Sequence, residues 1–224
     1  MTDILAVGAH PDDVEIGAGG TLIKMRDLGY SLAIVTATDG EPTPFGTRET
    51  RLKEAAAAAE MLGAELTILD MPNRYLEDTL DNRYKLALEI RKRRPRILLA
   101  PLAAGAHPDH IAVSGLADAA RFYSKLSKTD MYGSEWPGER YWPPKLYYYF
   151  LGVPPHRAEP KFVVNVTDVW DRKEKLLGCY GSQSNVNMHA LAASHVWGPM
   201  IGVQYAEAFT MDEAVGISDL FQLT

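Results

Sequence analysis

Residues 4–20 read ILAVGAHPDDVEIGAGG, an apolar run that passes directly into a turn rich in charged side chains. The first four residues of this stretch have the composition of a buried strand. The turn then carries a histidine and three carboxylates, which are His10, Asp12, Asp13 and Glu15. In an open parallel sheet, ligands bind in the crevice beyond the carboxyl ends of the strands. The stretch therefore predicts an α/β fold with a functional site directly after its first strand.

A second turn of the same chemistry follows another apolar run later in the chain. The run Ile97–Ala100 leads through a short loop into His107-Pro108-Asp109-His110. Carboxylates as close as those of the first turn repel one another unless a cation or a shared proton relieves them. Two such turns, each after an expected strand, are the strongest functional signal in the sequence.

Apolar runs alternate with helical patterns along the chain, which is typical of βαβ units. We expect strands near residues 3–9, 31–38, 65–70, 96–101, 145–151 and 162–166. We expect helices near 19–28, 49–62, 82–94, 110–126, 170–179 and 187–196. The pattern predicts one Rossmann-like, doubly wound α/β domain over residues 1–224, with a mostly parallel sheet. Because the first and fourth strands commonly flank the switch point of such sheets, the two turns should face each other.

Composition limits the function classes. The net charge of −6 argues against a general nucleic-acid surface, and no apolar stretch is long enough to span a membrane. The single cysteine, Cys179, and the absence of a visible signal peptide fit a cytoplasmic protein. The basic run Arg91–Arg94 is interpreted as a solvated helix end that complements the helix dipole. Residues 127–144, with Trp136, Tyr141 and Trp142, are expected to form an irregular insertion.

A catalytic zinc site needs three nitrogen or oxygen ligands and an open position for water. His10 and Asp13 lie three residues apart across a turn stiffened by a proline, so both can face one point. The second turn must supply the third ligand, and either His107 or His110 is suitable. The remaining histidines, which are expected to be surface or packing residues, are His156, His189 and His195.

Two other interpretations of the first turn are weaker. Acidic residues at a helix start are favourable as N-caps, but this explains neither His10 nor the second turn. A dinucleotide site would need a glycine-rich turn immediately after the first strand, and here Gly17, Gly19 and Gly20 come too late. We expect Gly19 and Gly20 to let the first helix begin tight against the sheet instead.

The two turns resemble the motifs of the PIG-L/LmbE-like zinc-dependent N-deacetylases, which act on N-acetylglucosamine-type substrates. Further matches extend over most of the chain, and they are Thr36-x-x-Asp39-Gly40, Arg51-x-x-Glu54-Ala55, Pro101, Tyr180-x-Ser182-Gln183 and the segment 202–209. One departure is that Gly105-Ala106 stand where some members place a tyrosine two residues before the second motif.

The resemblance implies a role for each candidate residue. His10, Asp13 and His110 would bind one zinc ion per chain, and Asp12 would be the general base. His107 would stabilise the oxyanion or protonate the leaving amine, with Asp109 orienting or charging it. Glu15 would support the ligands, Arg51 would reach the substrate sugar, and the roles of Tyr205 and Glu207 stay open. The resemblance also implies a small amino-sugar substrate and a homo-oligomer, either a trimer or a hexamer.

Two alternatives come from other function classes. A metal-dependent phosphoesterase also uses carboxylate-rich strand ends, but it normally needs ligands for two metal ions. A non-catalytic sugar- or nucleotide-binding α/β module would use the same fold without turnover. The loops expected to contact a substrate are 41–47, 73–81 and 127–144.

Overall fold

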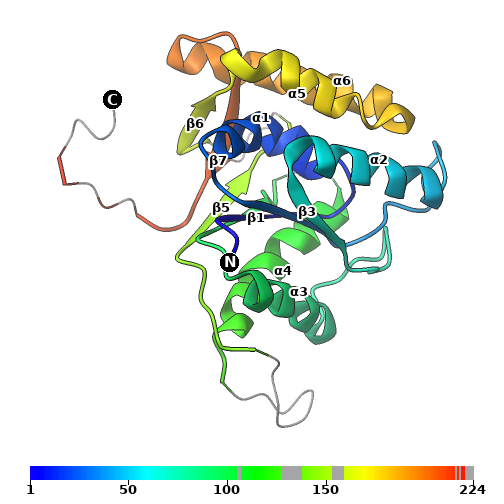
Figure 1. Cartoon of the computed structure of the whole chain (residues 1–224), viewed down its shortest axis with the longest axis vertical. Coiled ribbons are helices and arrows are strands. Elements are labelled where there is room, and N and C mark those ends of the chain that lie inside the picture. The colour runs from blue at the N-terminus through cyan, green and yellow to red at the C-terminus, as the bar shows by residue number, and fades with distance from the viewer. Residues whose placement is uncertain (105–106, 128–137, 153–158, 215, 217, 220–224) are drawn as a thin grey trace.

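A twisted sheet forms the centre of the molecule (Figure 1). The computed structural model describes all residues except 105–106, 128–137, 153–158, 215, 217 and 220–224, and except the side chains of 185–190. Within this part, the seven strands are β1 (Ile4–Gly8), β2 (Leu32–Thr36), β3 (Ala64–Ile68), β4 (Ile97–Pro101), β5 (Lys145–Tyr149), β6 (Phe162–Asn165) and β7 (Ala206–Thr210). Their order across the sheet is β3-β2-β1-β4-β5-β7-β6. The first five pair in parallel, whereas β7 runs antiparallel to both neighbours.

Helices cover both faces of the sheet, as a doubly wound fold requires (Figure 1). They are α1 (Asp13–Asp27), α2 (Arg48–Leu62), α3 (Leu80–Arg93), α4 (Pro108–Ser124), α5 (Trp170–Leu177) and α6 (Ser184–Trp197). Short 3₁₀ turns add residues 167–169, 181–183 and 198–201. The two largest apolar clusters lie on opposite faces, because α1, α2 and α5 pack on one face and α3 and α4 on the other. The expected Rossmann-like, mostly parallel α/β fold is confirmed.

The first helix differs from the sequence-based expectation. It begins at Asp13, whereas the expected start was Gly19. The glycines lie inside it for a different reason, since a Cβ on Gly17 would collide with the Tyr149 ring and one on Gly20 would lie 2.8 Å from Val166. Close approach to neighbouring elements, and not helix initiation, therefore requires glycine here.

Strand β7 was not expected from the sequence, and it has a direct contact with α1. Glu207 of β7 accepts hydrogen bonds from the backbone N–H groups of Gly20 (2.8 Å) and Thr21 (2.7 Å). Lys173 of α5 donates to Glu207 (2.6 Å) and to the carbonyl of Ile16 (2.9 Å). In a regular helix the Gly20 N–H donates to the Ile16 carbonyl. The buried Lys173–Glu207 ion pair therefore bonds to both the donor and the acceptor of one backbone hydrogen bond of α1. For Glu207, whose role was open, the structure gives a contact that ties α1 to α5 and β7.

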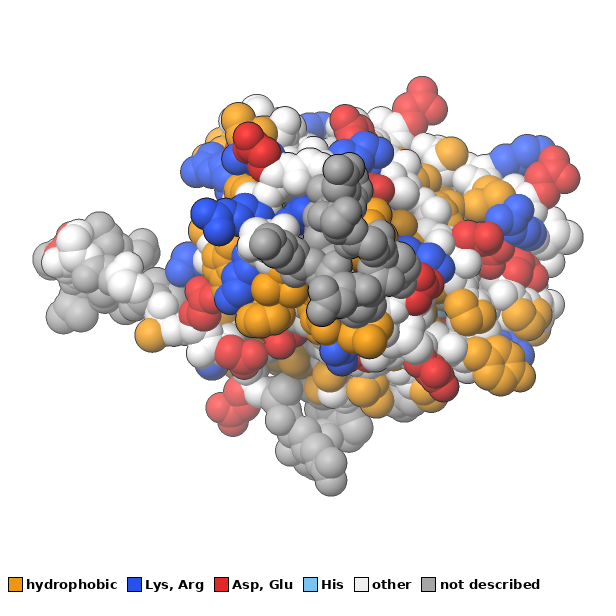
Figure 2. Space-filling model, turned by 90° about the horizontal axis from the view of Figure 1, so that it is seen from below, with side chains coloured by type: hydrophobic (Ala, Val, Ile, Leu, Met, Phe, Trp, Pro, Cys, Tyr) orange, Lys and Arg blue, Asp and Glu red, His pale blue; other side chains and the backbone are white. Residues whose placement is uncertain are grey.

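The basic run at the end of α3 is only partly solvated. Arg91 and Arg93 are buried, so the expectation of a solvated helix end is wrong for these two residues. Arg91 donates to the carbonyls of Ser124 (2.9 Å) and Leu126, which satisfies loop groups at the end of α4. Figure 2 shows basic and acidic side chains interspersed over the described part of the lower face, which offers no continuous basic surface there.

The expected insertion 127–144 is described only at its ends, because 128–137, with Trp136, lie outside the described residues. Tyr141 donates its hydroxyl to the carbonyl of Pro95 (3.0 Å), and the Arg121 guanidinium lies 4.2 Å from the Trp142 ring centroid. Both aromatic residues therefore anchor the segment to the domain. None of the helices in the described part of the chain is both long and apolar enough to cross a membrane.

Candidate active site

Strands β1 and β4 are neighbours, so the two His/Asp turns meet at the carboxyl edge of the sheet. The pairing sets Ile4 beside Ile97 and Ala6 beside Leu99. The ring centroids of the three turn histidines lie 4.8–5.3 Å apart, and these residues are His10, His107 and His110. The expected adjacency of the two turns is thereby confirmed.

The first turn is held by its own carboxylate. Asp13 Oδ2 accepts hydrogen bonds from the backbone N–H groups of Ala9 (2.8 Å) and His10 (2.9 Å). Asp12 occupies the N-cap position of α1 with φ 109°, a left-handed conformation that costs a non-glycine residue of order 1–3 kcal/mol. Its side chain makes no capping hydrogen bond within the described residues. Helix capping therefore does not explain the buried Asp12 side chain.

Three side chains from the two turns can hold one metal ion. Donor atoms of His10, Asp13 and His110 all lie within 4.8 Å of one another. His110 Nε2 lies 3.2 Å from Asp13 Oδ1, and His10 Nδ1 lies 3.5 Å from Asp13 Oδ2. Two imidazoles and one carboxylate are a donor set that zinc uses in catalytic sites. The residues therefore fit a zinc ion.

A second group of possible donors overlaps with the first. It consists of His10, His107 and Asp109, whose donor atoms also lie within 4.8 Å of one another. Because both groups contain His10, the described residues form two overlapping arrangements and not two separate ligand shells. This overlap disfavours a site for two metal ions of the kind that phosphoesterases use.

Burial and close charges shift the pKa values at the site. Burial disfavours a charged His10, but the carboxylates of Asp13 and Asp109 outweigh it and raise the pKa of His10 to about 9. Burial and the adjacent Asp13 charge raise the pKa of Asp12 to about 7, against the pull of Arg51. Burial also opposes ionisation of Asp13, yet His110 and His10 hold its pKa well below the usual range. Asp13 is thus anionic, as a metal ligand must be.

The second turn is built around the start of α4. His107 is the N-cap residue, and its Nδ1 accepts a hydrogen bond from the Asp109 N–H (3.2 Å). His107 is exposed overall, but partial desolvation of its ring and the charges of His10 and His110 lower its pKa. A largely neutral, accessible imidazole can exchange protons with a bound molecule near pH 7.

The side chain of Asp109 contacts His10, with its Oδ2 3.1 Å from His10 Nε2. The same oxygen accepts a hydrogen bond from the backbone N–H of Arg74 (2.7 Å). The carboxylate is buried and its Oδ1 has no hydrogen-bond partner among the described residues. Asp109 therefore positions His10 and the loop that carries Arg74. The expected role of Asp109 in orienting or charging His107 stays a prediction.

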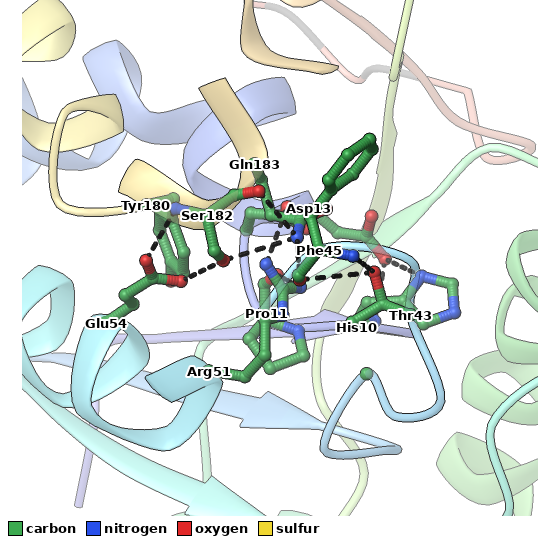
Figure 3. A network of polar contacts seen from close by, with 12 residues as sticks. His10, Pro11, Asp13, Thr43, Phe45, Arg51, Glu54, Tyr180, Ser182 and Gln183 are labelled. Carbon is green, nitrogen blue, oxygen red and sulfur yellow. Dashed lines mark hydrogen bonds and ion pairs between the residues drawn. The ribbon is translucent and has the colours of Figure 1, made fainter. Parts of the chain in front are cut away.

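Arg51 reaches from α2 to the first turn (Figure 3). Its Nη2 donates to the carbonyl of Pro11 (2.5 Å), and its Nη1 lies 3.4 Å from Asp12 Oδ2. The side chain is buried, although it forms part of the cavity wall. Arg51 thus holds the strained turn and the Asp12 carboxylate, and the expected contact with a substrate sugar stays a prediction.

Glu15 is buried behind the first turn. The hydroxyl of Tyr180 donates to its Oε1 (3.0 Å), and burial raises the pKa of Glu15 to about 7. The Tyr180 ring also lies 5.9 Å from the Arg51 guanidinium carbon. Glu15 and Tyr180 therefore support the turn from the side away from the cavity.

A cavity of about 320 Å³ opens in front of the three histidines. Its size is in the range of small-molecule sites. Beyond the turn residues, the wall contains Ile16, Gly40, Pro42, Thr43, Pro44, Asn73, Arg74, Leu151 and Gln183. The loops 41–47 and 73–81 were expected to face a substrate, and both contribute to this wall. The single residues Asn73 and Arg74 were not identified, because nothing in their local sequence marks them.

Gln183 connects the cavity wall to the loop 41–47 (Figure 3). Its side-chain amide donates to the carbonyl of Phe45 (3.1 Å). The neighbouring Ser182 donates through its N–H and its hydroxyl to Glu54 of α2 (2.7 and 2.6 Å). The motif Tyr180-x-Ser182-Gln183 therefore fastens one wall of the cavity to the domain.

The remaining sequence-based expectations lie away from the cavity. His195 is exposed and packs edge-on against Tyr205 at 4.7 Å between centroids, as expected for a packing residue. Tyr205 also stacks on Trp170 at 3.8 Å, which gives it a structural contact. His156, Gly105, Ala106 and the His189 side chain lie outside the described residues.

Comparison with known proteins adds independent evidence. A family model described as PIG-L, GlcNAc-PI de-N-acetylase, matches residues 5–121, more than half of the chain. Diacetylchitobiose deacetylase of Thermococcus kodakarensis is 28% identical over 91% of this chain and 80% of its own length. A 4-oxalmesaconate hydratase of Pseudomonas putida is 27% identical over 81% of this chain and 74% of its own length. A crystal structure of a conserved Thermus thermophilus protein superposes with a TM-score of 0.87 and 36% identity, covering 98% and 99% of the two chains.

Proposed function

Because this chain belongs to the PIG-L family, we propose that it is a zinc-dependent hydrolase that removes the N-acetyl group from an N-acetylglucosamine-type sugar or its conjugate. One observation carries the proposal. His10, Asp13 and His110 converge from two strand ends, with Asp12 and His107 beside them in one cavity. This is the arrangement of a metal site flanked by two proton-transfer groups.

The three converging residues would hold one zinc ion per chain. Bound there, zinc would polarise the acetamide carbonyl and lower the pKa of water. Asp109 keeps the His10 ring in place through its 3.1 Å contact, in the way that carboxylates commonly orient metal-ligating histidines. Asp13 keeps its orientation through the backbone N–H groups of Ala9 and His10.

Asp12 is the proposed general base. It is adjacent to a ligand in sequence, borders the cavity and is held by Arg51 at 3.4 Å. In the reaction, a water oxygen bonds to the acetamide carbon while Asp12 accepts a proton from that water.

His107 is the proposed proton donor at the other side of the cavity. The carbon–nitrogen bond breaks, the nitrogen receives a proton from His107, and acetate and a free amine leave. The donor form is the protonated imidazole, which the lowered pKa makes a stronger acid, and the proton that Asp12 took from water restores it after each turnover.

Acetate release tests the proposal directly. Zinc-loaded protein is incubated with N-acetylglucosamine, N,N′-diacetylchitobiose and anionic N-acetylglucosamine conjugates, and both acetate and free amine are measured. We expect equal amounts of the two products, loss of activity on chelation and recovery with zinc. A 4-oxalmesaconate hydratase is 27% identical to this chain, so hydration of 4-oxalmesaconate without acetate release from any sugar would contradict the proposal.

Metal content separates the remaining alternatives. One zinc ion per chain with acetate release supports the hydrolase. Two ions per chain with phosphate-ester cleavage would support the phosphoesterase, and ligand binding without any turnover would support the binding module. Light scattering of the same sample would test the proposed trimer or hexamer.

A further inference from the structure

Arg74 is a cation in the wall of the candidate active site whose side chain has no partner among the described residues. The charged side chains of this wall, apart from the histidines, are Asp12, Asp13, Arg51 and Arg74. Arg51 pairs with Asp12, and Asp13 is bonded within the turn and to His110. The guanidinium of Arg74 makes no ion pair or hydrogen bond to any described residue. It is therefore the charged group of the wall that is available to a bound molecule.

The backbone of Arg74 is fixed close to the metal ligands. Its N–H donates to Asp109 Oδ2 (2.7 Å), and that oxygen lies 3.1 Å from His10. Its φ of 66° is left-handed, a conformation that a non-glycine residue keeps only where its surroundings impose it. The preceding Asn73 is buried and donates to the carbonyl of Pro42 (3.3 Å) across the cavity wall. The backbone of Arg74 is thus connected to the proposed metal ligand His10 through the Asp109 carboxylate.

Acidic side chains of the surrounding loops pair with other arginines. Asp39 and Asp70 both pair with Arg48, at 2.6 and 3.2 Å. Asp78, on the same loop as Arg74, pairs with Arg83 at 2.7 Å. None of these three carboxylates forms an ion pair with Arg74, which is part of the cavity wall.

We propose that Arg74 binds a carboxylate or phosphate on the group attached to the acetylated sugar, which makes the enzyme selective for anionic conjugates. The inference rests on the proposed deacetylase function. Arg74 lines the same cavity as the three proposed metal ligands, so a group attached to the acetylated sugar is within the cavity that Arg74 borders. A guanidinium offers a planar fork of donors that matches two oxygens of a carboxylate or phosphate.

The test compares neutral and anionic substrates in wild type and in Arg74→Met, which keeps an apolar stem and removes the charge. The neutral substrates are N-acetylglucosamine and N,N′-diacetylchitobiose. The anionic ones are N-acetylglucosamine 1-phosphate and the malate conjugate of N-acetylglucosamine, which distinguish phosphate from carboxylate. We expect Arg74→Met to lower kcat/KM for the preferred anionic substrate about 10-fold and to change that for neutral substrates less than about 2-fold.

Two further variants control for trivial explanations. Arg74→Lys keeps the charge without the fork and should recover part of the selectivity. Lys92→Met removes an exposed cation from α3, outside the cavity wall, and should leave the ratio of anionic to neutral kcat/KM unchanged. An equal loss on both substrate classes in Arg74→Met, or an anion preference that survives in it, would overturn the inference.

Binding keeps this inference separate from the proposed function. If no sugar releases acetate, the deacetylase proposal fails, but calorimetry can still compare N-acetylglucosamine 1-phosphate with N-acetylglucosamine on zinc-loaded protein. Tighter binding of the phosphate that depends on Arg74 would support an anion site. Equal affinities in wild type and Arg74→Met would exclude it.

Discussion

The turn after β1 and the turn after β4 contain the same residue types, but their surroundings differ. In the first, Asp12 and Asp13 are buried, and bonds from Ala9, His10 and Arg51 hold the carboxylates and the backbone. In the second, His107 is exposed at the N-cap of α4, and only Asp109 is buried.

This difference divides the chemistry between the turns. A buried turn that is held by several hydrogen bonds keeps its metal-donor atoms in one geometry, which suits metal binding. An exposed imidazole can reach a substrate and exchange protons with water. The first turn therefore contributes two of the three proposed ligands and the base, while the second contributes one ligand and the acid. Four variants test this difference between the turns.

His110→Ala should have the largest effect, because it removes the ligand that connects the two turns. We expect zinc affinity to fall by more than about 100-fold, together with turnover, since even outer partners of metal ligands cost 10–100-fold. Zinc content after dialysis measures this. His195→Ala, a histidine outside the cavity wall, is the control and should keep its zinc. Unchanged zinc in His110→Ala would assign the third ligand to His107 instead.

Asp12→Asn should lower turnover by about 1,000-fold while zinc content stays at one per chain, because the amide cannot accept the proton. The matched control is Asp78→Asn, which removes a carboxylate from an ion pair with Arg83 outside the cavity wall. Steady-state kinetics and metal analysis of both proteins decide the point. Near wild-type kcat in Asp12→Asn would remove Asp12 from the role of base.

His107→Gln should lower kcat by about 100-fold and leave zinc bound. The expected loss is smaller than for Asp12, because His107 is exposed and water can partly replace it as a proton donor. The measurement is kcat against pH, along with zinc content. Loss of zinc from this variant would exchange the roles of His107 and His110 and so undo the contrast between the turns.

Asp109→Asn should have the smallest effect, about a 10-fold loss of zinc affinity. The reason is that its carboxylate contacts His10 of the first turn, and an amide is a weaker partner for that ring. Competition with a chelator measures the affinity, and Asp171→Asn on the exposed side of α5 is the control. A fall in kcat at full zinc occupancy would instead support the sequence-based role of Asp109 beside His107.

Much of the fold was predictable from local patterns. Apolar runs of strand length located β1, β2 and β4, because buried parallel strands are continuous hydrophobic segments. The start of α1 was not predictable in this way, since the Asp12 side chain makes no capping hydrogen bond and the later glycines resemble a helix start. Strand β7 was missed because a buried Glu207 interrupts its apolar pattern, and its partner Lys173 lies 34 residues away in sequence.

The candidate site was predictable to a similar degree. The residues of the two turns were identified because histidine and carboxylate side chains after strands have few structural uses. Arg74 and Asn73 were not, since their place in the wall depends on how their loop packs against Asp109 and Pro42. The contact of Asp109 with His10 was also unforeseen, because the two residues are 99 positions apart in the sequence.

The amino-acid sequence was enough to identify the chemical groups of the two turns and to show that each turn follows a strand. Side-chain chemistry and hydrophobic periodicity are local properties, so a single chain reveals them. The folded structure was needed to show that β4 pairs with β1, which of the turns is buried, and that Arg51 and Arg74 line the site. These outcomes depend on contacts between distant segments, whose geometry comes from packing of the whole domain and not from any one stretch of residues.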